Sequence, residues 1–168
     1  MNRKLFEYIA ASPSPYHAVG HSAELLRQAG FLPLSEGEDW RLAPGQGYYV
    51  TRNGSSLIAF RARRAFTGFM MTAAHSDSPT FKLKENPELT GSGCRRLAVE
   101  RYGGMIMSSW MDRPLGIAGR VLLRKGSGIE SRLLDLGGEC AVIPNVAIHM
   151  NRKANDGYSW NPAVDLLP

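Results

Sequence analysis

The chain has 168 residues, long enough for one hydrophobic core and a small second lobe, and its hydrophobic fraction of 43% excludes a disordered chain. The formal net charge of +5 permits weak attraction to polyanions, but the basic residues are scattered, so nucleic-acid binding ranks last among the candidate functions. Cys94 and Cys140 have no paired spacing, which excludes a zinc ribbon or disulfide framework and predicts reduced thiols in the cytoplasm. No apolar stretch approaches the ~20 residues that span a bilayer, so we expect no membrane partner.

Two helices are predicted at the start of the chain. An apolar pattern with helical spacing covers residues 5–10 and stops at the Ser-Pro-Ser-Pro run of residues 12–15. Ser14 followed by Pro15 is a favourable N-cap and first-position pair, because the missing N–H of proline would have no helical partner there. Gly30 is placed to end the second helix.

A β-hairpin is predicted next. Residues 48–52 and 55–60 flank Asn53-Gly54, which is the strongest two-residue turn signal. A two-residue loop would pair Val50 with Leu57 across the hairpin.

The apolar run at residues 69–74 predicts a buried strand, because it is almost uncharged and too short for an ordinary helix. It ends in His75-Ser76-Asp77, and Pro79 stops the strand. Enzymes built on α/β folds place their chemistry at the ends of buried strands. We therefore expect a functional site at this point of the chain.

The chain beyond Pro79 is predicted to be mostly β-structure. Several segments alternate apolar and polar residues or form short apolar runs, as strands do, and these are residues 81–84, 97–100, 120–124, 129–136, 141–143 and 146–149. No helical period of useful length appears after about Asn86. The first half therefore indicates α/β structure and the second half β-structure, with a boundary near residues 90–93 that separates domain 1–90 from domain 91–168.

His75 and Asp77 form the strongest candidate for chemistry. Residues two apart share a face of an extended chain, so the two side chains can converge. A carboxylate beside a metal-bound imidazole fixes its tautomer and raises its basicity, so His-x-Asp suits a ligand with its orienting partner. Taken alone, a three-residue pattern recurs by chance, and a structural histidine is then the simpler interpretation.

The surrounding motifs favour a metal ligand over a structural histidine at residue 75. Residues 73–79, preceded by Ser12-Pro13-Ser14-Pro15-Tyr16-His17-Ala18-Val19, resemble the M18 family of metallo-aminopeptidases, the aspartyl aminopeptidase type. Further matches follow in the order of that family at residues 102–104, 109–115, 118–121, 143–145, 147–152 and 161–162. Several separated motifs in a fixed order are far more specific than any one of them, and the resemblance covers essentially the whole chain.

The resemblance implies a fold and a set of roles. The fold would be the N-terminal part of an α/β metallopeptidase catalytic domain followed by part of an inserted β-rich dimerisation lobe. His75 would be a ligand of a two-zinc centre, with Co²⁺ or Mn²⁺ as alternative metals, and Asp77 would orient it. His149 would reach into the active site of a partner subunit, within a homodimer that assembles into a dodecamer. The substrates would be peptides, and the residue removed would be an acidic N-terminal one.

One part of the family pattern is absent from this sequence. M18 chains are more than twice as long, and a two-metal centre needs about five or six ligands. No Asp-x-Glu-Glu or similar acidic cluster exists here, and Glu36, Glu38 and Asp39 belong to a surface-like loop. We therefore expect this chain to be inactive alone. A non-catalytic self-assembly module derived from such an enzyme is the alternative.

Overall fold

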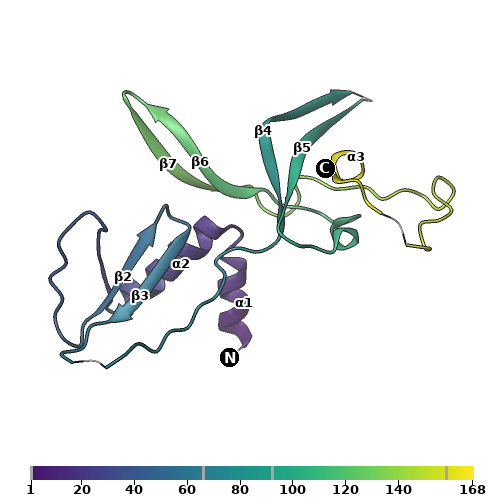
Figure 1. The fold of residues 1–168 in the computed structure, drawn as a ribbon. Coiled ribbons are helices and arrows are strands. Elements are labelled where there is room, and N and C mark those ends of the chain that lie inside the picture. The colour runs from purple at the N-terminus through teal and green to yellow at the C-terminus, as the bar shows by residue number, and fades with distance from the viewer. Residues whose placement is uncertain (1, 66, 92, 158) are drawn as a thin grey trace. The chain divides into compact units, whose positions relative to one another are not determined.

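The computed structural model describes residues 2–65, 67–91, 93–157 and 159–168 (Figure 1). Ser92, within the predicted domain boundary, lies outside the described residues. The chain divides into two compact units, unit 1 with Met1–Ser78 and Ala118–Asp135, and unit 2 with Pro79–Ile117 and Leu136–Pro168. These two units do not coincide with the predicted domains 1–90 and 91–168. The assignment of one part to a catalytic domain and the other to a dimerisation lobe stays a prediction.

Unit 1 begins with the two predicted helices, α1 (Asn2–Ala10) and α2 (Pro15–Gln28). The Ser14 Oγ accepts a hydrogen bond from the His17 N–H at 3.4 Å, which confirms the predicted N-cap. Gly30 has a φ of 80°, and the N–H groups of Gly30 and Phe31 donate to the carbonyls of Arg27 and Leu26. This pattern is a Schellman motif, so α2 ends as predicted. Among the described residues, no helix is long and apolar enough to cross a membrane.

A three-stranded sheet packs beside α2, in the order β1 (Leu32–Pro33), β2 (Gly47–Arg52) and β3 (Ser56–Arg61). Strand β1 is parallel to β2, and β3 is antiparallel to β2. Helix α2 lies against the β2–β3 hairpin (Figure 1). The buried side chains of this unit come from these elements and are Ala18, Val19, Tyr48, Tyr49 and Val50.

The register of the β2–β3 hairpin differs from the prediction. Val50 pairs with Ile58, not with Leu57, because Ser55 stays in the loop and Arg52 pairs with Ser56. Asn53 and Gly54 both have positive φ, at 53° and 66°, so the turn forms where it was predicted. One additional loop residue shifts every rung of the ladder by one position.

The predicted strand at residues 69–74 is wrong. The described chain has no strand between Arg61 and Thr80, and Met70 and Met71 are 105% and 86% exposed. An apolar run becomes a buried strand only when a neighbouring strand supplies its ladder bonds and another layer covers its face. No described strand pairs with this run, and its large side chains Phe69, Met70 and Met71 are exposed.

A second hairpin completes unit 1, formed by β6 (Ala118–Lys125) and β7 (Gly128–Asp135), as the alternating pattern predicted. Arg120 contacts the first part of the chain: its guanidinium lies 4.2 Å from the centroid of the Tyr16 ring, and its Nη1 donates to the Asn53 carbonyl at 2.7 Å. These contacts explain why residues 118–135 belong with the N-terminal helices.

Unit 2 contains the hairpin of β4 (Thr80–Gly91) and β5 (Cys94–Tyr102), the 3₁₀ helix η1 (Met107–Trp110) and the short helix α3 (Pro162–Asp165). The hairpin confirms the strands predicted at 81–84 and 97–100. The hydrophobic core of unit 2 is formed by Met111, Ile143 and Leu166. The side chains packed against this core are Phe81, Met107, Trp110, Leu115 and Trp160.

The strands predicted at residues 141–149 are wrong. Ala141 and Ile143 form only isolated bridges, to Leu115 and Met111, and residues 148–150 form a turn. Pro144 lacks an N–H and therefore cannot continue a ladder, so the chain leaves extended pairing at this residue.

Candidate functional site

His75 and Asp77 converge as predicted. The His75 Nδ1 lies 2.9 Å from the Asp77 Oδ1, within hydrogen-bond distance. The His75 side chain is 91% exposed and that of Asp77 is 28% exposed, so the carboxylate is held against the protein while the imidazole faces water. With Nδ1 occupied by the carboxylate, Nε2 is the ring nitrogen left to bind a metal or a substrate group.

The segment that carries this pair is attached to the β2–β3 turn. The Ser76 Oγ donates a hydrogen bond to the Ser55 carbonyl at 2.8 Å. Ser55 is the additional loop residue of the hairpin and lies outside the paired residues of β2 and β3. This bond connects the backbone between His75 and Asp77 to a turn whose conformation is set by Asn53 and Gly54.

The chemistry of the pair fits one metal ligand and its orienting carboxylate, and no more. Zinc takes four ligands in a structural site, and a two-metal catalytic centre needs more. Within residues 2–65, 67–91, 93–157 and 159–168, no group of three or more His, Cys, Asp or Glu side chains is placed to hold a metal ion. Among the described residues, no third metal-binding side chain joins His75 and Asp77.

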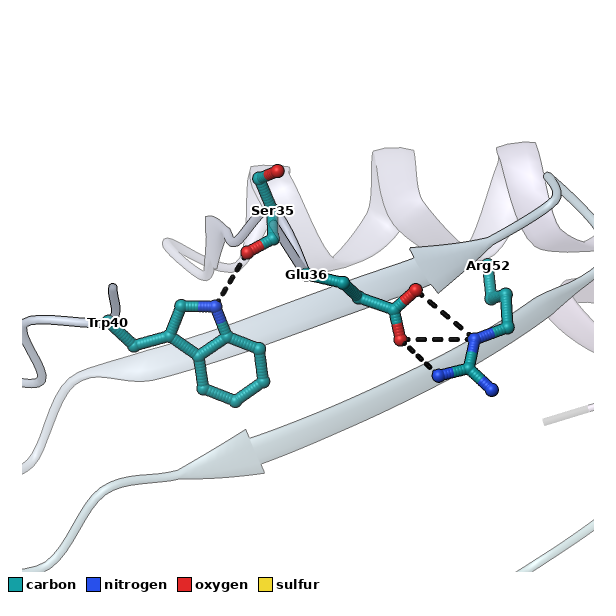
Figure 2. A network of polar contacts seen from close by, with 4 residues as sticks. All are labelled: Ser35, Glu36, Trp40 and Arg52. Carbon is teal, nitrogen blue, oxygen red and sulfur yellow. Dashed lines mark hydrogen bonds and ion pairs between the residues drawn. The ribbon is translucent and has the colours of Figure 1, made fainter. Parts of the chain in front are cut away.

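The loop of unit 1 that carries Glu36, Glu38 and Asp39 holds one of these carboxylates against an arginine. Figure 2 shows the Glu36 carboxylate against the Arg52 guanidinium, with Arg52 Nη2 donating to Glu36 Oε1 at 2.6 Å. This hydrogen bond, together with the positive charge of Arg52, lowers the pKa of Glu36. In the same loop, the Trp40 indole N–H donates to the Ser35 carbonyl at 2.7 Å. Glu36 therefore fixes the loop to β2, as a surface element.

His149 lies in unit 2, in the exposed turn of residues 148–150. The Met150 N–H donates to the Ala147 carbonyl at 2.8 Å and closes this turn. His75 belongs to unit 1. The roles predicted for His75, Asp77 and His149 stay predictions.

Asp112 is not among the candidate residues predicted from the sequence. Asp112 has a φ of 53°, and its Oδ1 accepts a hydrogen bond from the Asn145 N–H at 2.8 Å, across a separation of 33 residues. The signals that could have indicated this pair are the turn-forming sequences Asp112-Arg113-Pro114 and Pro144-Asn145. Neither sequence indicates that the two turns are in contact.

Comparison with protein families gives one consistent result. A family model described as aminopeptidase I zinc metalloprotease (M18) matches residues 8–168. A probable M18 family aminopeptidase 2 from Pseudomonas entomophila strain L48 is 44% identical over 171 residues, which is 100% of this chain and 40% of that protein. The protein of the same name from Pseudomonas paraeruginosa is 45% identical, also over 100% of this chain and 40% of its own length. The chain thus spans 40% of the length of these curated relatives.

Solved structures give the same result. A cryo-EM structure of the Ape4 and Nbr1 complex matches with a TM-score of 0.91 at 39% identity, over 96% of this chain and 32% of that chain. Chaetomium thermophilum mApe1 matches with a TM-score of 0.88 at 29% identity, over 99% and 39% of the two chains. The S. cerevisiae mApe1 dodecamer matches with a TM-score of 0.71 at 31% identity, over 88% and 36%.

Proposed function

Because the chain belongs to the M18 family of aminopeptidases, we propose that it forms part of a metal-dependent aminopeptidase, which hydrolyses the N-terminal residue from peptides. The observation that carries the proposal is the exposed imidazole of His75 with the Asp77 carboxylate at its Nδ1, in a chain matched over its whole length by relatives of this family. An acidic N-terminal residue is the preferred substrate in this proposal.

His75 is proposed as a zinc ligand through Nε2, and Asp77 as its orienting carboxylate. The carboxylate keeps the proton on Nδ1, so that Nε2 presents its lone pair outward. In such enzymes a pair of metal ions, here two Zn²⁺ with Co²⁺ or Mn²⁺ as alternatives, makes water nucleophilic and polarises the scissile carbonyl. Only His75 and Asp77 of the described residues enter this part of the proposal.

His149 is proposed to act in the active site of a partner subunit. An exposed imidazole on a turn can donate a hydrogen bond to the oxygen that becomes negatively charged when the scissile carbonyl is attacked. The solved dodecamer of a 31%-identical relative supports an oligomer in which such a contribution between subunits is feasible. We accordingly propose a homodimer that assembles into a dodecamer.

The 168-residue chain alone is proposed to be inactive. Its described residues provide one ligand and one orienting carboxylate, against the five or six ligands of a two-metal centre. Purified chain should release no N-terminal residue from an acidic dipeptide substrate with Zn²⁺ or Co²⁺ added. Turnover that depends on the added metal would overturn this statement.

The metal role of His75 can be tested without activity. In a protein of full family length that carries this segment, Asp77→Asn should weaken zinc binding about 10- to 100-fold, because an amide cannot stabilise the Nδ1 proton as a carboxylate does. Asp39→Asn, in the exposed acidic loop, is the matched control and should leave binding unchanged. Equal zinc affinity in Asp77→Asn and wild type would refute the site. A full-length protein with no bound metal would favour the alternative, a non-catalytic assembly module.

A further inference from the structure

Asp112 has a backbone conformation that few residues adopt. Its φ of 53° lies in the left-handed region, which glycine, asparagine and aspartate enter far more readily than other residues. It directly follows the buried Met111, whose backbone bridges the fully buried Ile143. The chain therefore turns sharply at the point where it leaves the core of unit 2.

Asp112 holds the chain on both sides of Pro144. Its N–H donates to the Ile143 carbonyl at 2.9 Å, and its Oδ1 accepts from the Asn145 N–H at 2.8 Å. Proline has no N–H, so Pro144 cannot contribute a donor of its own. The direction of the chain through this proline thus depends on the two bonds to Asp112.

The segment held in this way leads directly into the turn that carries His149. The Val146 N–H donates to the Asn145 side-chain oxygen at 2.9 Å, and the turn then closes on the Ala147 carbonyl. A series of hydrogen bonds therefore runs from Asp112 to Asn145, from Asn145 to Val146, and then within the turn at residues 148–150. The buried Met111–Ile143 bridge supports this path at its start.

We propose that Asp112 is a positioning residue, which sets the direction of the chain at Asn145 and thereby places the His149 imidazole. It acts through the backbone, and no contact between Asp112 and substrate is part of the proposal. The inference rests on the proposed function of His149. It goes beyond that function by naming the group that orients the turn.

Two variants separate the Asp112 side chain from its backbone conformation. Asp112→Gly permits the positive φ without steric strain and removes the oxygen that accepts from Asn145. Asp112→Asn keeps both the left-handed tendency and a side-chain carbonyl acceptor. Asp156→Gly is the matched control, because Asp156 is exposed and lies beyond the turn.

The first measurement uses the 168-residue chain and does not involve activity. Hydrogen exchange at the Asn145 amide should become about tenfold faster or more in Asp112→Gly, and the NMR signals of the His149 ring should shift. Asp112→Asn should keep the wild-type exchange rate, and Asp156→Gly should change neither signal. Unchanged exchange at Asn145 in Asp112→Gly would overturn the role of Asp112, whatever the function of His149.

The second measurement uses a protein of full family length that carries this segment. Asp112→Gly should lower kcat about as much as His149→Phe, with zinc content unchanged, and the double variant should be no slower than His149→Phe alone. Asp112→Asn should restore most of the rate. If His149→Phe itself leaves kcat unchanged, the proposed function of His149 fails and this inference fails with it. A normal rate in Asp112→Gly beside a slow His149→Phe overturns the role of Asp112 alone.

Discussion

Truncating Ile143 should destabilise unit 2 far more than truncating its neighbour in the chain. Ile143 is fully buried at 0% exposure and packs with Met111 and Leu166, whereas Val142 is 48% exposed. Ile143→Ala removes three carbon atoms at ~0.8 kcal/mol each, and the cavity left behind raises the total to about 3 kcal/mol. Val142→Ala removes two carbon atoms that are about half buried, which gives ~0.8 kcal/mol.

The measurement is urea unfolding followed by tryptophan fluorescence. Trp110 and Trp160 pack against the core that contains Ile143, and Trp40 lies in unit 1, so a Trp40→Phe background makes the signal report on unit 2. With an m-value of about 1.5 kcal/mol/M, the midpoint should fall by about 2 M in Ile143→Ala and about 0.5 M in Val142→Ala.

Equal midpoint shifts in the two variants would refute the burial of Ile143. The same result would remove the support for Asp112, because the Met111–Ile143 bridge holds one side of its hydrogen bonds in the core. Ile143→Val should lie between wild type and Ile143→Ala, at about 1 kcal/mol, since it removes one carbon atom and leaves a small cavity. A shift in Ile143→Val as large as in Ile143→Ala would indicate a backbone rearrangement.

Two further predictions concern unit 1. Ser14→Ala should destabilise unit 1 by about 1 kcal/mol in thermal unfolding, because it removes the N-cap of α2. Ser12→Ala should be neutral or stabilising, since the Ser12 Oγ is buried without a partner among the described residues. The hydrogen bond from Arg52 lowers the pKa of Glu36 below its ordinary 4.5, so its stabilisation is present above pH 4.5 and is lost as the pH falls through the lower, folded-state pKa. The urea midpoints of wild type and Arg52→Met should therefore differ at pH 6, and the difference should shrink as the pH falls below 4.5. A difference that stays constant over this range would contradict the explanation.

Local signals predicted the helices and the position of the first turn. The Ser14 cap and the Gly30 stop act within a few residues, so their outcome does not depend on the rest of the fold. Asn53-Gly54 predicted the hairpin turn for the same reason. The sequence did not predict that Ser55 would remain in the loop, because the register also depends on which faces of β2 and β3 are covered.

Features that depend on distant residues were not predicted correctly. The apolar run at residues 69–74 has the composition of a buried strand, but burial needs a neighbouring strand that no described residue supplies. The return of residues 118–135 to unit 1 depends on Arg120 meeting Tyr16 and Asn53, and no local pattern indicates such a contact. The bond from Asn145 to Asp112 is of the same kind.

The His75–Asp77 pair was predicted although the strand that was to carry it does not form. The reason is that the two side chains are separated by one residue and the chain bends at Ser76, so they come together without a sheet. A strand would add only the direction in which the pair points. If a further strand joins residues 69–74 in a longer protein, the imidazole and its carboxylate should keep their contact. We therefore propose that the pair is a preformed metal ligand with its orienting group, and its Nδ1–Oδ1 distance should not change when a metal binds at Nε2.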